Sequence, residues 1–273
     1  LKDSDELIKT KNIIIATGTK QKNLPGIKLD GKKILIFGAG GSIGSEISRQ
    51  VVNFNAREIY LVDSSEYNLF QITSELRYLN KNFKSLLGSI VDENFMNKLT
   101  NLELDIIINA AAYKHVNLVE KNKLMALKNN FYGNYLCCEL ALKTKSKNFI
   151  LISTDKAVEP LTFMGLTKRL CELMVLYYGR QFSKKINFCS VRFGNVINSS
   201  GSVIPIFQER ISKNLPLELT DPKMKRYFMT IEEASRLVLL SLTLNIDEKI
   251  CYLNMGSQIS IIKLAKQMIR FSG

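Results

Sequence analysis

The stretch KILIFGAGGSIG, residues 33–44, decides the fold. Its apolar part, 33–37, is typical of a strand buried on both faces of a parallel sheet. The glycines that follow permit a tight turn and let backbone amides approach a pyrophosphate, and a helix beginning at Ser45 adds partial positive charge. A plain tight turn is the alternative, but the strand–turn–helix order favours a dinucleotide site. The residues that we predict in it are Gly38, Gly40, Gly41, Ser42, Ile43 and Gly44.

The next predicted strand, Glu58–Val62, is followed by an acid, Asp63. A carboxylate there accepts hydrogen bonds from both ribose hydroxyls of NAD and repels the 2′-phosphate of NADP, so it predicts NAD as the cofactor. The next two predicted strands complete the site. The strand Lys84–Leu87 ends where the adenine would lie, and the strand Asp105–Asn109 is followed by alanines that leave room for the cofactor. The contacts predicted there are Ser89, Ile90, Ala110, Ala111 and Ala112.

Short apolar runs alternate with amphipathic stretches through most of the chain, which predicts the α/β class with a doubly wound (Rossmann) parallel sheet. The predicted strands are Lys33–Phe37, Glu58–Val62, Lys84–Leu87, Asp105–Asn109, Asn148–Ser153, Ile186–Val191 and Ile250–Asn254. The apolar spacing of Leu166, Leu170, Leu173 and Tyr177 predicts a helix between the strands Asn148–Ser153 and Ile186–Val191.

The alternation divides the chain into three parts. Residues 1–31 form an atypical N-terminal segment, and residues 32–193 form an NAD-binding Rossmann domain. Residues 194–273 form a small substrate lobe, interleaved with the last strand and helices of the sheet and truncated at its C-terminus. Glycines and prolines interrupt the periodicity after residue 194, as in a loop-rich lobe at the carboxyl edge of a sheet.

The composition is globular: 46% of the 273 residues are hydrophobic. The formal net charge of +13 favours an anionic partner, but the basic residues are scattered, so we expect no nucleic-acid binding. Five cysteines without a CxxC pair, and one histidine, argue against metal sites and disulfides. The chain has no apolar run long enough for a membrane span, so we expect a cytoplasmic location, although a longer parent chain could carry a membrane tether.

Many single-domain NAD enzymes of this layout use a Tyr-x-x-x-Lys pair on the helix after the fifth strand, and this chain has none. Lys168 stands at the lysine position, but Met164 replaces the tyrosine one helical turn earlier. Since methionine accepts no proton, either the chain is inactive or other groups move the proton. Such groups follow the fifth strand: Asp155 for proton exchange, Lys156 as a base when desolvation favours its neutral form, and Thr154 for a substrate hydroxyl. A salt-bridged loop is the alternative.

Polar residues after the fourth and sixth predicted strands would lie at the same edge of the sheet. Hydroxyls, an amide and glycine backbone suit sugar or phosphate contacts, and paired cations near residue 226 suit a diphosphate. A capping histidine and a solvated basic loop are the alternatives. The substrate contacts that we predict are Lys114, His115, Thr154, Asn195, Ser202 and Arg226.

Seven ordered strings cover roughly residues 32–270. They are GAGGSIGSE at 38–46, NAAAYKHV at 109–116, STDKAVEP at 153–160, MGLTKR at 164–169, VRFGNV at 191–196, SSGSVIP at 199–205 and RYFMT at 226–230. Together they resemble the extended short-chain dehydrogenase/reductase superfamily and, within it, the UDP-N-acetylglucosamine 4,6-dehydratases of the polysaccharide-biosynthesis (CapD-like) group. The most similar subgroup carries methionine in place of the tyrosine, as Met164 does.

The resemblance implies a lyase that converts a UDP-N-acetylhexosamine, UDP-GlcNAc first, to the 4-keto-6-deoxy sugar for glycan or polysaccharide biosynthesis. Tightly bound NAD is recycled, because hydride leaves C4 of the sugar and returns to C6. Lys156 would remove the C5 proton, Asp155 would protonate the departing C6 hydroxyl, and Lys168 would hold the nicotinamide ribose. Thr154 with a water, or Asp155, would take the C4 hydroxyl proton. We also expect a homo-oligomer.

Two features support a different interpretation. In the group that the chain resembles, an Arg- and Glu-containing segment beyond the position of Gly273 helps to bind the nucleotide diphosphate, and Met164 carries no proton acceptor. A catalytically impaired NAD-binding scaffold of the same fold is therefore the alternative function. The intact sequence Thr154-Asp155-Lys156 disfavours it.

Overall fold

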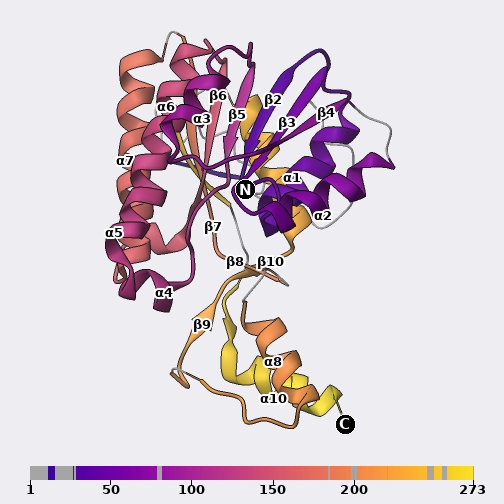
Figure 1. The fold of residues 1–273 in the computed structure, drawn as a ribbon. Coiled ribbons are helices and arrows are strands. Elements are labelled where there is room, and N and C mark those ends of the chain that lie inside the picture. Colours follow the sequence, from indigo (N-terminus) through magenta and orange to yellow (C-terminus); the bar gives the residue numbers. More distant parts are fainter. Residues whose placement is uncertain are drawn as a thin grey trace, which may run out of the picture.

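The structure is a computed structural model that describes residues 12–15, 27, 29–78, 82–183, 185–197, 199, 202–219, 221–244, 249–253 and 257–272. Its centre is an eight-stranded sheet with strand order β1-β11-β7-β6-β5-β2-β3-β4 (Figure 1). All neighbouring pairs are parallel. The strands are β1 Asn12–Ile15, β2 Lys33–Phe37, β3 Glu58–Asp63, β4 Phe83–Leu87, β5 Ile106–Asn109, β6 Asn148–Thr154, β7 Asn187–Phe193 and β11 Lys249–Leu253.

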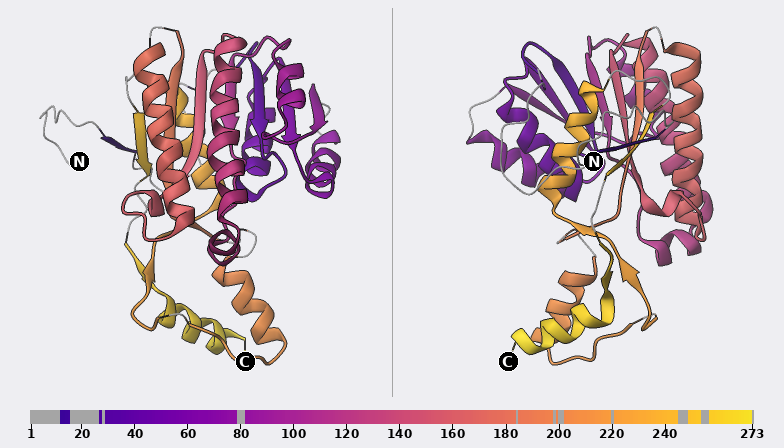
Figure 2. Two further views of the ribbon diagram at one scale, coloured as in Figure 1. Left: turned by 60° about the vertical axis from the view of Figure 1, so that its left-hand side comes forward. Right: turned by 180° about the vertical axis from the view of Figure 1, so that it is seen from behind.

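Helices cover both faces of the sheet, which confirms the predicted doubly wound α/β class. On one face lie α1 Ser42–Asn53, α2 Glu66–Arg77 and α9 Ile231–Leu240, and the view from behind in Figure 2 shows α9 beside α1. On the other face lie α3 Glu93–Leu99, α6 Gly133–Lys143 and α7 Phe163–Phe182. Two short helices, α4 Val116–Lys121 and α5 Lys123–Ala126, and a π-helix, Leu127–Tyr132, precede α6.

Strand β2 shows why both faces must be covered. Ile34 and Ile36 pack into the core beneath α1, α2 and α9, whereas Leu35 and Phe37 pack into the opposite core. All four residues are 0% exposed, and their alternation follows from the pleat of a strand. Each such buried side chain stabilises the fold by about 1.5–3 kcal/mol, so the central strand is strongly determined by its own residues.

The seven predicted strands all form, and their ends differ from the prediction by at most two residues. Asn254, the predicted end of the last one, lies outside the described residues. The segment 1–31, which we set apart, adds the eighth strand: β1 pairs with β11 at the edge of the sheet, with Asn12 opposite Ile250.

A small lobe lies at the carboxyl edge of the sheet, below it in the view of Figure 1. It contains α8 Val203–Ser212 and α10 Ile261–Phe271, which pack around the buried residues Phe207, Ile261 and Ala265. Two-residue strands link its parts: β8 Asn195–Val196 pairs with β10 Phe228–Met229, and β9 Lys225–Arg226 pairs with β12 Ile259–Ser260. Strands this short leave no periodic pattern, so sequence analysis did not predict them.

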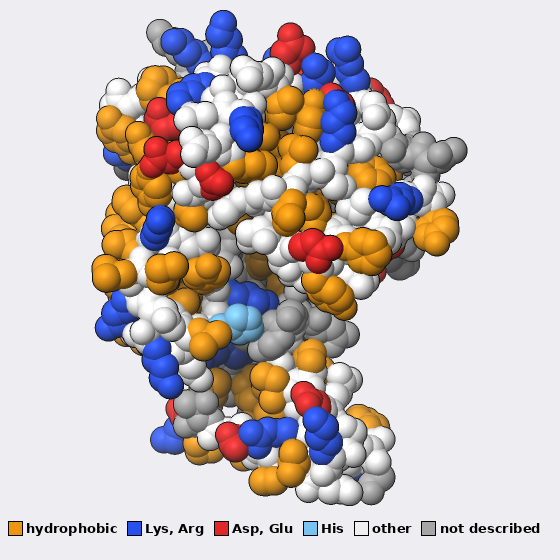
Figure 3. Space-filling view, viewed as in Figure 1, with side chains coloured by type: hydrophobic (Ala, Val, Ile, Leu, Met, Phe, Trp, Pro, Cys, Tyr) orange, Lys and Arg blue, Asp and Glu red, His pale blue; other side chains and the backbone are white. Residues whose placement is uncertain are grey.

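The apolar spacing that predicted helix α7 marks its outer face. Leu166, Leu173 and Tyr177 are 40%, 46% and 59% exposed, whereas the buried residues of α7 include Met164, Cys171, Val175 and Tyr178. Figure 3 shows hydrophobic side chains gathered along this side of the molecule. Within the described ranges, no helix combines the length and apolar character that crossing a membrane requires.

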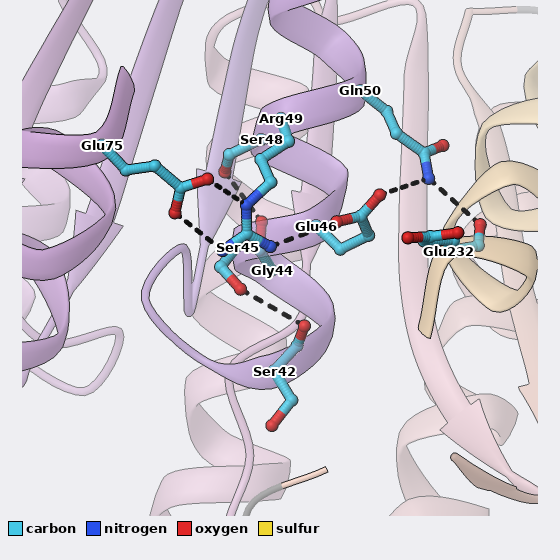
Figure 4. A network of polar contacts seen from close by, with 9 residues as sticks. All are labelled: Ser42, Gly44, Ser45, Glu46, Ser48, Arg49, Gln50, Glu75 and Glu232. Atoms are coloured by element: carbon cyan, nitrogen blue, oxygen red, sulfur yellow. Dashed lines mark hydrogen bonds and ion pairs between the residues drawn. The ribbon is translucent and has the colours of Figure 1, made fainter. Parts of the chain in front are cut away.

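Helix α1, which follows the glycine turn, is fixed to its neighbours by polar contacts (Figure 4). Arg49 donates to both carboxylate oxygens of Glu75 on α2, at 2.6 and 2.8 Å, and to Glu46 on its own helix at 3.1 Å. Gln50 donates to the backbone oxygen of Glu232 on α9 at 3.0 Å. These contacts fix α1 against α2 and α9 on one face of the sheet.

Gly44→Ala should destabilise the protein by about 1–3 kcal/mol, because overpacking costs this much and a Cβ on Gly44 would overlap the carbonyl oxygen of Gly38. Gly179→Ala is the matched control: a Cβ on this α7 glycine would lie 3.7 Å from Phe188, an ordinary contact. Alanine favours helices over glycine by about 1 kcal/mol, so the control should be neutral or stabilising. Urea unfolding measures both, and equal effects would contradict the packing argument.

Candidate active site

The turn after β2 brings distant parts of the backbone into contact. Gly38 has a φ of +71°, in the left-handed region that favours glycine, and a Cβ on it would lie 2.8 Å from the amide nitrogen of Ala111. Gly41 is the N-cap residue of α1, so the positive end of the helix dipole faces the turn. Close backbone approach and a helix N-terminus are what a bound pyrophosphate requires.

Asp63, at the end of β3, is oriented by two backbone amides. Its Oδ2 accepts a hydrogen bond from the amide of Gly40 at 2.9 Å, and its Oδ1 accepts one from the amide of Ser65 at 2.9 Å. Each carboxylate oxygen has a further lone pair. The carboxylate is therefore held in one orientation and retains the capacity to accept from ribose hydroxyls.

A cleft of about 180 Å³ lies between this turn and the ends of the neighbouring strands. Most of the predicted cofactor residues line it, namely Gly38, Gly41, Asp63, Ser89, Ile90, Ala110, Ala111 and Ala112. Gly40 faces away from it: a Cβ there would lie 2.5 Å from Asn68, so this glycine permits the close packing of the turn on α2. Ser42, Ile43 and Gly44 form the first turn of α1.

Lys168 and Met164 lie one turn apart on α7, on its buried face. The Nζ of Lys168 donates to the carbonyl oxygen of Ile152 on β6 at 2.7 Å, and burial lowers the pKa of this lysine. Met164 is 4% exposed and packs with Val119 and Ala126. The position one helical turn before Lys168, where a Tyr-x-x-x-Lys pair would place its tyrosine, is thus occupied by an apolar contact in this chain.

The turn Thr154–Lys156 follows β6, and its side chains bond to one another. Thr154 Oγ1 donates to Asp155 Oδ1 at 2.9 Å, and Lys156 Nζ donates to the same oxygen at 3.0 Å. The side chains of Asp155 and Lys156 are 25% and 32% exposed, so a ligand can reach both. Gly165 lets α7 approach this turn, because a Cβ there would lie 2.5 Å from the carbonyl oxygen of Lys156.

Asn195 lies on β8, at the junction with the small lobe, and contacts Lys156 of the turn after β6. Its Oδ1 accepts a hydrogen bond from Lys156 Nζ at 3.0 Å. The sequence predicts Asn195 as a substrate contact and does not indicate its bond to Lys156. With its oxygen occupied by the lysine, the amide nitrogen is the part of Asn195 that is left to donate to a ligand.

The loop after β5 is held by Asn130, which sequence analysis did not single out. Asn130 lies in the π-helix and is 3% exposed; it accepts from the amide of Tyr113 at 2.8 Å and donates to its carbonyl at 3.0 Å. This fixes the backbone directly before Lys114 and His115. His115 is the N-cap residue of α4, and desolvation lowers the pKa of Lys114 although its side chain still reaches solvent.

A buried ion pair lies behind the turn. Glu172 and Arg192 are 0% and 2% exposed, and Arg192 Nε donates to Glu172 Oε1 at 2.6 Å. Ser153, which directly precedes Thr154, donates to the same oxygen at 2.6 Å. The pair thus joins β6, β7 and α7, and loss of one partner would leave a buried charge uncompensated. Local spacing does not indicate this pair, because Glu172 and Arg192 lie 20 residues apart on different elements.

The remaining predicted substrate residues belong to the small lobe. Ser202 is the N-cap residue of α8, and Arg226 lies on β9. Figure 3 shows basic side chains and the histidine side chain in the recess between the lobe and the sheet, where they would attract an anion. In the part of the chain that the structure describes, no three Asp, Glu, Cys or His side chains gather as a metal site would need.

The fold is a Rossmann-type, doubly wound α/β fold with a cleft at the carboxyl edge of its parallel sheet. The X-ray structure of Pen from Bacillus thuringiensis matches it with a TM-score of 0.85 and 30% identity, over 90% of this chain and 75% of that chain. Residues 34–273 match the family described as polysaccharide biosynthesis protein. The chain belongs to that family.

Two relatives indicate the kind of activity found among similar proteins. The probable polysaccharide biosynthesis protein EpsC of Bacillus subtilis is 43% identical over 250 residues, which are 90% of this chain and 42% of that protein. The UDP-N-acetylglucosamine 4,6-dehydratase (inverting) of Campylobacter jejuni is 32% identical over 216 residues, 77% of this chain and 63% of that enzyme. Others of comparable identity are named UDP-glucose 4-epimerase. The chain spans about two-fifths of the first curated relatives that it matches.

Asp63→Asn should destabilise the protein by about 1–3 kcal/mol, because the side-chain NH₂ would face one of the two backbone amides and leave it unpaired. Asp92→Asn is the matched control. Asp92 accepts from a single amide, that of Phe95, as the N-cap residue of α3, and asparagine serves that position equally well. Chemical denaturation compares the two; an unchanged midpoint for Asp63→Asn would show that the two amides do not depend on the carboxylate.

Proposed function

We propose that this chain catalyses the NAD-dependent 4,6-dehydration of a UDP-N-acetylhexosamine, with UDP-GlcNAc as the first substrate to test, to a 4-keto-6-deoxy sugar. The observation that carries the proposal is the cluster of Thr154, Asp155 and Lys156 at the end of β6. A carboxyl group beside an amine supplies the acid and the base that dehydration requires. Relatives that are named for this reaction on UDP-N-acetylglucosamine support the sugar class.

The cleft fits NAD. The glycine turn would hold the pyrophosphate, Asp63 the adenine ribose and Lys168 the nicotinamide ribose. Asp63 favours NAD over NADP, because a 2′-phosphate would meet its carboxylate. When bound, NAD supplies a reversible acceptor for hydride. The small side chains Ala110–Ala112 line this cleft and would leave room for the cofactor.

The hydrogen bonds of the turn define two proton paths. Thr154 Oγ1 donates to Asp155, so it can accept the proton of the sugar C4 hydroxyl while it passes its own to Asp155. Asp155 then gives that proton to the departing C6 hydroxyl, which leaves as water. Lys156 removes the C5 proton, which the neighbouring C4 carbonyl has made acidic, and returns it to C5 after water has left, when C6 is reduced. Neither path needs a proton acceptor at Met164.

The nucleotide half of the substrate would lie between the sheet edge and the small lobe. Lys114, His115 and Arg226 would face its diphosphate, and the hydroxyl of Ser202 would add a hydrogen bond. The amide nitrogen of Asn195 would donate to the substrate on the same side. These contacts would bring the sugar ring to the turn after β6.

Two other functions share this fold. A non-catalytic scaffold would bind NAD without forming product, and a 4-epimerase would oxidise C4 but keep the C6 hydroxyl. The pair Asp155 and Lys156 favours dehydration, because epimerisation at C4 requires neither C5 deprotonation nor protonation of the C6 hydroxyl. The products separate all three possibilities.

Asp155→Asn and Lys156→Ala should leave NAD binding intact and lower 4-keto product formation at least about a hundredfold, since general acid–base groups contribute about 10²–10⁴-fold. Proton NMR of a UDP-GlcNAc reaction follows the 6-methyl doublet, and isothermal titration calorimetry follows NAD binding. Met164→Leu is the control: it keeps the buried volume and removes no proton-transfer group, so turnover should stay near that of the unchanged protein. Near-normal turnover in Asp155→Asn or Lys156→Ala would contradict the assignment.

We also propose that the chain forms a homo-oligomer through the outer face of α7, where Leu166, Leu173 and Tyr177 are exposed. Contiguous exposed apolar side chains mark association sites. Leu173→Lys should therefore lower the mass measured by light scattering. Leu215→Lys, at an exposed leucine of the small lobe, should not. A monomeric parent protein at micromolar concentration would contradict the proposal.

A further inference from the structure

We infer that Asn195 is a positioning residue for Lys156: its side-chain oxygen directs the lysine amine toward the substrate, so the small lobe takes part in aiming the base. This inference rests on the proposed function, in which Lys156 removes the C5 proton. It goes beyond a substrate contact, because the bond from Asn195 runs to the lysine itself.

The amine is held from two different parts of the chain. Lys156 Nζ lies 3.0 Å from Asp155 Oδ1, which belongs to its own turn, and 3.0 Å from Asn195 Oδ1, which belongs to β8. The backbone of Asn195 is in turn fixed by the β8–β10 pairing, in which its amide donates to the carbonyl oxygen of Tyr227 at 3.2 Å. Lys156 is therefore tied to the sheet through Asp155 and to the lobe junction through Asn195.

Two acceptors suit a lysine that acts as a base. A neutral amine has two N–H bonds and one lone pair. When Asp155 and Asn195 accept both N–H bonds, the lone pair points in the remaining tetrahedral direction. Without Asn195, rotation about the Cε–Nζ bond would let the lone pair turn away from the C5 proton.

The neutrality of Asn195 also matters, because a second carboxylate beside Lys156 would favour the protonated amine. In the described ranges, Asp155 is the charged side chain within ion-pair distance of Lys156. On α7, which packs on the turn, Lys168 is bonded to Ile152 and Glu172 is paired with Arg192. On the other side, β10 presents the uncharged residues Phe228 and Met229.

The test compares Asn195→Asp and Asn195→Ala with the parent protein. Asn195→Asp should move the half-point of the acidic limb of the kcat–pH profile upward by about one unit or more, with activity recovered at high pH. Asn195→Ala should lower kcat about tenfold or more, with a smaller change in KM. Asn97→Asp, the same change at an exposed position of α3, should leave the profile where it is.

A second readout does not depend on turnover. The rate at which an amine-reactive reagent labels Lys156, followed against pH by peptide mass spectrometry, reports the pKa of this lysine. Asn195→Asp should shift that labelling curve upward by about one unit or more, even if UDP-GlcNAc proves not to be a substrate. An unmoved labelling curve in Asn195→Asp would overturn the inference, as would a raised KM with unchanged kcat in Asn195→Ala. Absence of product from the parent protein, with a shifted labelling curve, would overturn only the proposed function.

Discussion

The parallel direction of β5, β6 and β7 is the constraint on which the candidate site depends. Parallel strands end at one edge of the sheet, so the loop with Lys114, the turn with Lys156 and the strand with Asn195 meet there although they are far apart in the sequence. Hydrogen-bonded strands lie about 4.8 Å apart, which lets side chains at neighbouring strand ends reach one ligand. The apolar cores on the two faces keep this edge in register.

The groups that hold the site are buried, whereas the groups proposed for chemistry remain partly exposed. Glu172 and Arg192 are almost fully enclosed and fix the end of β6 through Ser153. Asn130 does the same for the loop after β5. Asp155 and Lys156, by contrast, keep a quarter to a third of their side-chain surface open. This division leaves the reactive groups accessible while their backbone is rigidly supported.

The central strands and the turn after β6 are predictable from the sequence because both carry local signals: continuous apolar runs, and polar residues directly after a strand. The sequence does not predict β8, since two residues carry no periodicity. The bond between Asn195 and Lys156 depends on that strand and on its pairing with Phe228, so it was equally beyond local patterns. The apolar spacing at Leu173 indicated a helix correctly, but the spacing alone does not tell an inward face from an outward one.

The small lobe has an apolar cluster of its own around Phe207 and Ile261, and it joins the sheet through the short β8–β10 pair that carries Asn195. A lobe with its own packing can diverge, or be exchanged between relatives, without disturbing the two large cores. Such an exchange would also replace a group that touches Lys156. Chimaeras that exchange the lobe should therefore retain the strand around Asn195 from the parent that supplies the sheet, because a graft boundary placed before it would replace the side chain that accepts the hydrogen bond of Lys156.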